Sequence, residues 1–520
     1  MAEDCFSNNF VHMYVSEFTS RIVAESGIPS DRFHLGKIVL KSFQDDPDFV
    51  MQIDGATGQS ETNGSVLKRT VKCAISLKNM GLKKGDVMVL MAPNHLDLTI
   101  PFYAGWYLGL AVAPTDMTME TCKYTMKPKI VFCQSEKVED VQKAIKTLGL
   151  DTAVISFDKS FKTQSLPEMM KTFGNEVNAQ EFKAEDFDPE ETIALLLPTS
   201  GTTGAPKAAA LTHKNMLTFG IPMRRPTVLL VAPLQWLSGI VSFVMSPYIK
   251  YTRVQSSAAA TSKHLIELMK KYKPTFLITS PTMLASLLKS AEVEQHDFSN
   301  FELLYIGGSA VSSELVKELK VNNLLTADVP HDEPNDAGFN LVDVITKEEI
   351  KEPNKPGELW LKGPSVFKGY YNNPEMSKEA FAEDRWFMTG DLLYRDENWN
   401  YFFVERIKLL LKYRNHQISP VELETVIRQH PGISDVAVTG VSDLECGDLP
   451  VACVVKRPGY EVTAADIKEL VKEKLSDSKQ LRGGVLFMNE LPLTSSTKLH
   501  RRKVKEIVME RINELELQRD

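Results

Sequence analysis

Short runs of β-branched and other apolar residues alternate along this chain with longer segments that repeat apolar residues at helical spacing. The runs that predict buried strands are residues 87–91, 130–132, 153–155, 228–231 and 275–278. Between them, residues 65–79 and 138–148 have the spacing of helices that bury one face. Strands that alternate with helices on this scale predict an α/β fold with layered, largely parallel sheets.

Near residue 405 the pattern changes to a smaller unit with shorter elements. Residues 401–404 predict a strand before the change, and residues 419–430 predict a helix with Pro420 in its first turn. The remaining predicted elements are strands at 436–441 and 451–455, a helix at 464–475 and a charged surface helix at 503–518. We therefore predict a large N-terminal α/β domain, residues 1–404, and a small C-terminal α+β domain, residues 405–520.

The composition speaks against several classes of protein. The 520 residues carry a net charge of -8, whereas nucleic-acid-binding proteins usually present a basic face, so we expect no nucleic-acid partner. The six cysteines lack the close spacing of a zinc site and are too few for a disulfide scaffold. They fit thiols in a reducing compartment.

The most apolar stretch, residues 98–114, is interrupted by Pro101, Gly105 and Gly109. It is too short for a membrane span, and it predicts a buried helix that runs into a strand. The N-terminus has no secretory signal, and the C-terminus is not the Ser-Lys-Leu peroxisomal signal. We therefore expect a soluble cytoplasmic protein with no membrane span.

A loop rich in glycine, serine and threonine follows the predicted strand at residues 193–197. Its sequence from 198 to 207 is Pro-Thr-Ser-Gly-Thr-Thr-Gly-Ala-Pro-Lys, which is not the Gly-x-x-x-x-Gly-Lys-Ser/Thr pattern of a P-loop. Glycines let the backbone approach a ligand closely, and hydroxyls, amides and a lysine suit polyphosphate oxygens. The candidate phosphate-binding residues are Ser200, Gly201, Thr202, Thr203, Gly204 and Lys207.

Several motifs in one order along residues 35–505 make the chain resemble the adenylate-forming superfamily of acyl-CoA synthetases, 4-coumarate–CoA ligases, beetle luciferases and peptide-synthetase adenylation domains. The motifs are the loop just described, Gly-Gly-Ser-Ala at 307–310, Gly-Glu-Leu-Trp at 357–360, Trp-Phe-Met-Thr-Gly-Asp at 386–391, the hinge-like stretch at 406–420 and the segment at 481–498. The resemblance is closest to the 4-coumarate–CoA ligase-like and insect luciferase-like branch.

This resemblance implies a large N-terminal domain and a C-terminal lid that rotates between two half-reactions. In the first, a carboxylate attacks the α-phosphate of ATP and gives acyl-AMP and pyrophosphate. In the second, the thiol of coenzyme A attacks the acyl carbon and AMP leaves. The implied function is an acid–thiol ligase for a fatty or aryl acid that uses ATP, Mg²⁺ and coenzyme A. Many such relatives are peroxisomal.

The resemblance also implies roles for individual residues. Lys498 corresponds to the lysine that bridges the carboxylate and the α-phosphate, and Lys412 to the lysine that the rotated lid brings in. Asp391 and Arg406 correspond to ribose contacts, and Lys408 to the hinge position. Negative charge that develops on a phosphate needs cations, and a carboxylate is a natural acceptor for two hydroxyls. The residues that correspond to the adenine-contacting segment are Gly308, Ser309 and Ala310.

The sequence departs from the family where an aromatic-Gly-x-Thr-Glu motif is expected. Residues 321–328 read Val-Asn-Asn-Leu-Leu-Thr-Ala-Asp, so Thr326 stands at the threonine position and Ala327 at that of the metal-binding glutamate. Asp328 lies one residue out of register and is the candidate metal ligand. Losing a carboxylate that holds a metal beside a polyphosphate should cost several kcal/mol of transition-state stabilisation.

A second departure concerns the acyl pocket, where the family often has an aromatic-His pair after a proline. Here Pro233 is followed by Leu-Gln and then Trp236. Trp236 either fills the carboxylate end of the pocket or packs in the core.

Two other functions stay open beside the ligase. The altered motif around Ala327 fits a pseudoenzyme that binds ATP or acyl groups without turnover. A luciferase-like monooxygenase would use the same adenylate, and no sequence motif separates it from a ligase. The retained lysines, among them Lys207, Lys412 and Lys498, favour an active ligase.

Overall fold

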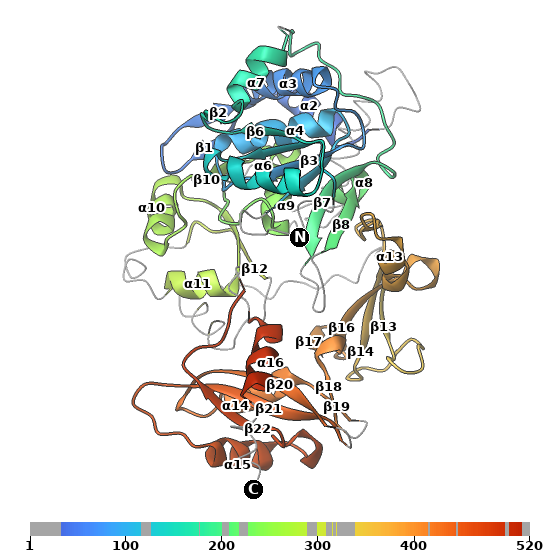
Figure 1. The fold of residues 1–520 in the computed structure, drawn as a ribbon, viewed down its shortest axis with the longest axis vertical. Helices are drawn as coiled ribbons and strands as arrows, with labels where there is room; N and C mark the ends of the chain where they lie inside the picture. Colours follow the sequence, from blue (N-terminus) through green and yellow to red (C-terminus); the bar gives the residue numbers. More distant parts are fainter. Residues whose placement is uncertain are drawn as a thin grey trace, which may run out of the picture. The chain divides into compact units, whose positions relative to one another are not determined.

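The computed structural model describes residues 33–115, 126–175, 177–199, 207–217, 227–288, 299–307, 315, 319, 338–413, 416–443, 446–494 and 499–511. These residues form two compact units (Figure 1). The first comprises the described residues of 1–328 and 364–378, and the second those of 329–363 and 379–520. The domain boundary at residues 404 and 405 stays a prediction.

A seven-stranded sheet forms one half of the first unit. Its strands, in sheet order, are β15 (Gly369–Tyr370), β8 (Lys207–Thr212), β7 (Ile193–Thr199), β4 (Ala111–Pro114), β3 (Val87–Met91), β5 (Ile130–Cys133) and β6 (Ala153–Ser156). From β7 to β6 neighbouring strands are parallel, whereas β8 is antiparallel to both of its neighbours. The strands predicted from the apolar runs at 87–91, 130–132 and 153–155 are confirmed.

A six-stranded sheet forms the other half of the first unit. Its strands, in sheet order, are β12 (Leu303–Ile306), β11 (Phe276–Thr279), β9 (Thr227–Leu229), β10 (Thr252–Gln255), β1 (Val50–Asp54) and β2 (Ser60–Thr62). All pairs are parallel except β1 with β2. The prediction of largely parallel sheets is therefore confirmed for this unit.

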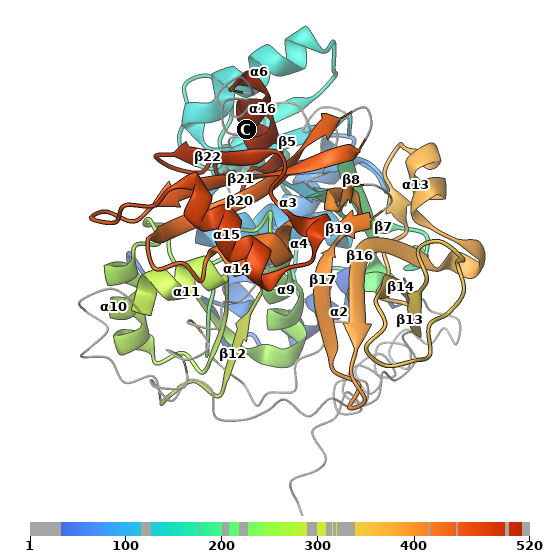
Figure 2. The same cartoon turned by 90° about the horizontal axis from the view of Figure 1, so that it is seen from below.

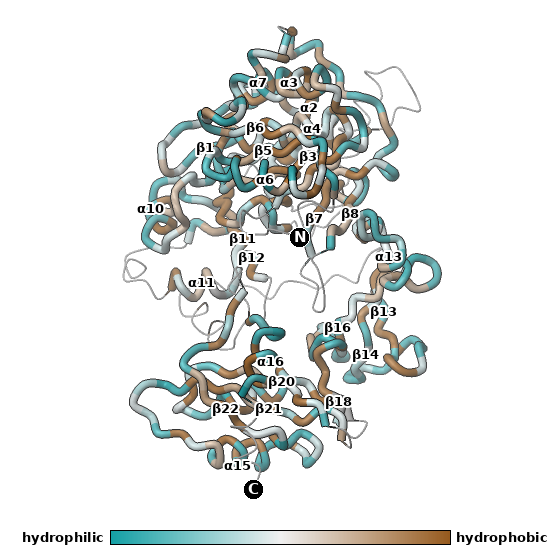
Figure 3. The backbone as a smooth tube through the Cα atoms, viewed as in Figure 1, coloured by the Kyte–Doolittle hydropathy of each residue, from teal (hydrophilic) through white to brown (hydrophobic). Residues whose placement is uncertain are grey.

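Helices separate and cover the two sheets. One hydrophobic core joins both sheets to the helices between them, which are α2 (Leu35–Asp45), α3 (Asn63–Asn79), α4 (Thr99–Tyr107) and α9 (Leu237–Met245). The outer helices include α6 (Val138–Thr147) on the seven-stranded sheet and α10 (Ser262–Tyr272) on the six-stranded one. Every residue of α4 is buried, which explains why this helix carries no charged residue on any side. Strands of the core such as β3 are hydrophobic segments in Figure 3. The predicted buried helix running into a strand is α4 followed by β4.

Short helices complete the first unit. They are α7 (Leu166–Phe173), α8 (His213–Leu217) and α11 (Pro281–Leu288). No helix in the described part of the chain is both long and apolar enough to cross a membrane.

The second unit begins with a four-stranded antiparallel sheet. Its strands, in order, are β13 (Gly338–Val342), β14 (Gly357–Lys362), β16 (Phe387–Arg395) and β17 (Tyr401–Arg406). The apolar runs from which we predict parallel strands lie between residues 87 and 278, and the sequence pattern predicts no strand direction for this sheet. Connections as short as the one from β16 to β17 leave no room for a crossover helix, so they join antiparallel strands.

A second sheet in the same unit carries three helices. Its strands are β19 (His416–Ile418), β18 (Leu411–Tyr413), β21 (Gly447–Lys456) and β20 (Ile433–Asp443), with β22 (Gly484–Met488) parallel to β21. Helices α14 (Pro420–Ile427) and α15 (Ala464–Lys474) pack on one face, and α16 (Arg501–Glu510) packs on the other (Figure 2). This is the small α+β arrangement predicted from the sequence, and Ser419 caps α14 as expected for a helix with Pro420 at its start.

His213, the first residue of α8, is a buried histidine whose two ring nitrogens have no hydrogen-bond partner among the described residues. Its ring lies 4.9 Å from Phe187 and 5.4 Å from His34, measured between centroids. Burial, together with the neighbouring His34, lowers the pKa of His213 well below its ordinary value. His213 is therefore neutral in the folded protein at pH 7.

This depressed pKa predicts a loss of stability in mild acid. Below about pH 6.5 the unfolded chain takes up a proton that folded His213 does not, so the free energy of unfolding falls as pH decreases, by at most ~1.4 kcal/mol per pH unit for this group. Urea unfolding at pH 8, 7, 6 and 5 measures the slope. His213→Leu is expected to flatten it between pH 7 and 5; parallel curves for the two proteins would contradict the assignment.

Candidate functional site

The candidate phosphate loop connects two antiparallel strands of the first unit. Strand β7 ends at Thr199 and β8 begins at Lys207, and these two residues are paired across the hairpin. The Thr199 hydroxyl donates to the Lys207 carbonyl oxygen at 3.3 Å. The loop itself, residues 200–206, lies outside the described residues, so the roles of Ser200, Gly201, Thr202, Thr203 and Gly204 stay predictions.

Lys207 stands at the base of this loop beside a distant part of the chain. Strand β15 pairs with β8, so that Tyr370 lies opposite Ala209. The Lys207 Nζ is 5.1 Å from the centre of the Tyr370 ring, a cation–π contact. Residues 369–371 therefore lie beside β8 and Lys207, a relation that their position in the sequence does not reveal.

Two further candidate segments belong to the first unit. Gly307 follows β12, and its amide donates to the Thr279 carbonyl oxygen at 3.1 Å; Gly308, Ser309 and Ala310 lie outside the described residues. Trp236 immediately precedes α9 and is 39% exposed. This exposure rules out packing in the core for Trp236, and its place in an acyl pocket stays a prediction.

In the second unit the structure brings Asp391 and Arg406 together. They face each other on the neighbouring strands β16 and β17, and the Arg406 Nε lies 2.6 Å from the Asp391 Oδ1. The Asp391 Oδ1 is a buried atom, and apart from this ion pair it has no hydrogen-bond partner among the described residues. The two predicted ribose contacts are thus neighbours, and one buried acceptor remains available.

The motif around Asp391 is held by residues of β14. Gly390 has a φ of +71° beside an irregularity in the pairing of β14 with β16, a conformation that favours glycine. The Gly390 amide donates to Glu358 Oε1 at 3.2 Å, and the Thr389 hydroxyl donates to the Leu359 carbonyl oxygen at 2.7 Å. Glu358 belongs to the Gly-Glu-Leu-Trp motif, although the motif alone assigns no role to it.

The protonation of Asp391 reflects this environment. Burial raises the pKa of Asp391, the Arg406 guanidinium opposes this effect, and the nearby Glu358 carboxylate adds to it, so that the net shift is upward. A half-buried carboxylate whose charge is only partly compensated by one arginine favours a site that supplies hydroxyl donors when a ligand binds.

The three remaining lysines of the predicted site also belong to the second unit. Lys408 is exposed in the turn Ile407–Leu409 directly after β17. Lys412 lies in β18, paired with Gln417 of β19. Lys498 lies outside the described residues, but the chain on either side of it closes together, because Leu493 pairs with Leu499 and the His500 amide donates to the Pro492 carbonyl oxygen at 2.8 Å.

A metal site is not apparent in the part of the chain that the structure describes. No group of three or more histidine, cysteine, aspartate or glutamate side chains there is arranged to hold a metal ion. Thr326, Ala327 and Asp328 lie outside that part. Asp328 therefore remains a predicted ligand.

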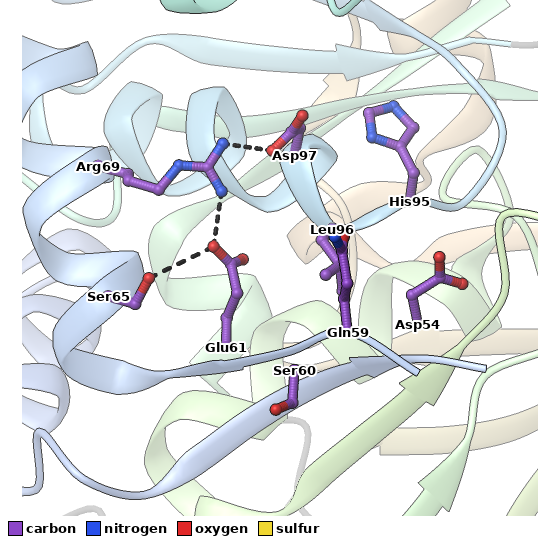
Figure 4. Close-up of a pocket in the computed structure, with 9 residues that line it drawn as sticks. All are labelled: Asp54, Gln59, Ser60, Glu61, Ser65, Arg69, His95, Leu96 and Asp97. Carbon is purple, nitrogen blue, oxygen red and sulfur yellow. Dashed lines mark hydrogen bonds and ion pairs between the residues drawn. The ribbon is translucent and has the colours of Figure 1, made fainter. Parts of the chain in front are cut away.

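A polar cavity of about 470 Å³ in the first unit contains none of the predicted site residues (Figure 4). Arg69 lies between the carboxylates of Glu61 and Asp97 and forms an ion pair with each. Glu61 also accepts from Gln52, whose own carbonyl oxygen accepts from the buried Arg253 at 2.9 Å. These charges compensate one another within the protein, which suits a structural network. The residues lining the cavity are Asp54, Gln59, Ser60, Glu61, Ser65, Arg69, His95, Leu96 and Asp97.

Comparison with known proteins identifies the family. Residues 40–325 match the family described as AMP-binding enzyme, and residues 422–498 match the AMP-binding enzyme C-terminal domain. The chain belongs to this family. The two matches contain the phosphate loop and the segment up to Lys498, and they confirm the predicted membership of the adenylate-forming superfamily.

Relatives of this AMP-binding enzyme cover almost its whole length. Luciferin 4-monooxygenase of Nipponoluciola cruciata is 30% identical over 88% of this chain and 90% of its own. Probable 4-coumarate–CoA ligase 1 of Dictyostelium discoideum is 26% identical over 95% of this chain and 97% of its own. The crystal structure of ATP-bound MatB from Rhodopseudomonas palustris superposes with a TM-score of 0.80 over 92% of this chain and 99% of that one, at 21% identity, which confirms the two-domain α/β fold.

Proposed function

We propose that the protein activates a fatty or aryl carboxylic acid with ATP, as acyl-AMP, and passes the acyl group to coenzyme A. Membership of the AMP-binding enzyme family supports the first step, and the 4-coumarate–CoA ligase relatives support the second. The observation that carries the proposal is the Asp391–Arg406 pair, in which a buried carboxylate oxygen has no hydrogen-bond donor.

The pair suits the ribose of a nucleotide. A carboxylate can accept from both ribose hydroxyls, which would supply the donor that Asp391 Oδ1 lacks. The Arg406 guanidinium fixes the carboxylate from the neighbouring strand and keeps part of its charge compensated. Since the phosphates of ATP also need cations, Lys207 at the base of the phosphate loop and Lys498 would complete the nucleotide contacts in this proposal.

Chemistry at the acyl group then depends on stabilising charge more than on moving protons. The carboxylate substrate is already ionised at pH 7, so its attack on the α-phosphate needs cations that offset the added negative charge. Lys498 would bridge the two reacting groups. After the lid turns about Lys408, Lys412 would take its place while the thiol of coenzyme A attacks and AMP leaves. ATP is expected to bring Mg²⁺ with it.

A second candidate function rests on the luciferin 4-monooxygenase relative, which is 30% identical. An oxygenase of this kind would use the same acyl-AMP and let oxygen, in place of coenzyme A, attack it. The two functions share every residue assigned to the first half-reaction. They differ in the product, so identifying the product distinguishes the two functions.

The experiment incubates the full chain with ATP, Mg²⁺, coenzyme A and a panel of medium-chain, long-chain and aryl acids, and identifies products by mass spectrometry. An acyl-CoA that forms only when acid, ATP and coenzyme A are all present supports the ligase. Acyl-AMP that accumulates without acyl-CoA, together with oxygen consumption, would favour the oxygenase. Bound ATP with neither product would favour a pseudoenzyme.

Asp391→Ala is expected to weaken ATP binding. Removing the acceptor of two ribose hydroxyls should raise the KM for ATP by at least about 100-fold, because each hydrogen bond to a charged group contributes about 1.5–3 kcal/mol. The KM for the acid should change little. Glu397→Ala, on the exposed turn after β16, is the matched control and is expected to have no effect. An unchanged KM for ATP in Asp391→Ala would contradict the ribose assignment.

A further inference from the structure

Glu405 is a buried carboxylate immediately before the predicted hinge. It is 2% exposed and lies in β17, next to Arg406. Its Oε2 accepts two hydrogen bonds from the start of α14, one from the Val421 amide at 3.2 Å and one from the Ser419 hydroxyl at 3.4 Å. Its Oε1 accepts from the Arg406 amide at 2.8 Å. Both carboxylate oxygens are therefore used.

These contacts connect two parts of the chain that lie on opposite sides of Lys408. Glu405 precedes the turn Ile407–Leu409, whereas Ser419 and Val421 follow it. The first amides of a helix carry partial positive charge, so a buried carboxylate at this end of α14 is favourable beyond the two hydrogen bonds. Ser419 is at the same time the helix cap, because its hydroxyl oxygen accepts from the Glu422 amide at 3.3 Å.

We propose that Glu405 is a positioning residue, whose hydrogen bonds to Ser419 and Val421 hold α14 against β17 in one orientation of the C-terminal lid. These hydrogen bonds, which we call the clamp, have to break before the lid adopts the other orientation. This inference rests on the proposed function, in which the chain turns about Lys408. Such a turn moves Ser419 and Val421 while Glu405 stays in β17, so both contacts of Oε2 must break. The clamp thereby sets the balance between the two orientations.

The clamp is next to the nucleotide contacts. Successive residues of a strand point to opposite faces, so Glu405 reaches α14 while Arg406 reaches Asp391 on β16. One short strand end therefore carries both a proposed ribose contact and the contact that fixes the lid. A nucleotide that alters the position of Arg406 would act on the clamp through the adjacent backbone.

The test measures the orientation directly, so that it does not depend on activity. Spin labels are placed before and after the hinge through Glu397→Cys and Glu473→Cys, two exposed positions of the second unit. The distance between the labels is measured by pulsed electron paramagnetic resonance in the otherwise unchanged chain, in Glu405→Ala and in Glu405→Gln.

The matched control is Glu422→Gln. Glu422 is also an acid in the first turn of α14, but its partner Lys479, at 2.6 Å, lies on the same side of the hinge, so this pair need not break when the lid turns. Removing it tests whether the loss of any carboxylate from this helix end has the same effect as the loss of the clamp.

Glu405→Ala is expected to raise the ratio of the second orientation to the first by about tenfold, the equivalent of one charge-assisted hydrogen bond. Glu405→Gln keeps an acceptor and is expected to give a smaller change, and Glu422→Gln none. If the wild-type protein forms acyl-CoA, the rates of the two half-reactions should change in opposite directions in Glu405→Ala. A distance distribution that Glu405→Ala leaves unchanged, or that Glu422→Gln alters equally, would overturn the clamp even if acyl-CoA is formed. A shifted distribution in a protein that makes no acyl-CoA would refute the proposed function but not the clamp.

Discussion

Replacing Lys498 by alanine is expected to reduce acid-dependent ATP–pyrophosphate exchange by at least about a hundredfold, because the reacting carboxylate and α-phosphate would lose the cation between them. Exchange is measured with the best acid of the panel at saturating ATP. The ends of the segment that carries Lys498 are fixed by the pairing of Leu493 with Leu499, so the substitution should leave the surrounding fold intact.

A matched control is available on the next helix. Lys505 is an exposed lysine of α16, and Lys505→Ala removes the same charge a short distance along the chain. It is expected to keep full exchange activity. Equal exchange in Lys498→Ala and the wild-type protein would contradict the role assigned to Lys498.

Arg501→Met is expected to lower the free energy of unfolding of the C-terminal part by about 3–5 kcal/mol, because it leaves a buried carboxylate without its cation. Glu424 is 2% exposed. Arg501 donates to its two oxygens at 2.8 and 3.1 Å, and the Val438 amide donates to the same carboxylate at 2.8 Å. The pair joins the start of α16 to α14 and β20. Urea unfolding, followed by circular dichroism, measures the loss.

The neighbouring Arg502 provides the control for this prediction. Arg502 forms an exposed ion pair with Glu506 at 3.1 Å, and Arg502→Met is expected to cost less than about 1 kcal/mol. A double variant, Arg501→Met with Glu424→Leu, should recover much of the lost stability, since it removes both charges together. Equal decreases in the free energy of unfolding for Arg501→Met and Arg502→Met would show that burial of Glu424 does not determine the loss of stability.

Local sequence patterns predicted much of the fold. Residues 87–91 and 130–132 are apolar without alternation because β3 and β5 are covered on both faces, and this pattern is visible in the sequence alone. The capped helix at Ser419 was equally predictable, since its cap and Pro420 are adjacent in the chain. The antiparallel sheet at 338–406 was not, because strand direction depends on which distant segments pair.

The candidate site, like the fold, was predicted only in part from the sequence. Asp391 and Arg406 were predicted from motifs, and their contact follows from the pairing of β16 with β17. Glu358 and Glu405 were missed, although Glu358 stands in the motif at 357–360 and Glu405 directly precedes the hinge-like stretch at 406–420. What makes them important is burial and a hydrogen-bond partner far along the chain, which the sequence does not show. A lone glutamate in a sequence is usually a solvated charge. The contact of Tyr370 with Lys207 was also missed, because it joins two residues that are far apart in the chain.

The most direct test of the central claim, that this chain activates a carboxylic acid as its adenylate, is ATP–pyrophosphate exchange with fatty and aryl acids, with and without Mg²⁺. The account predicts exchange that requires one class of acid and Mg²⁺ and that disappears in Lys498→Ala. Absence of exchange with every acid, in a protein that still binds ATP, would contradict it and favour a binding protein without turnover.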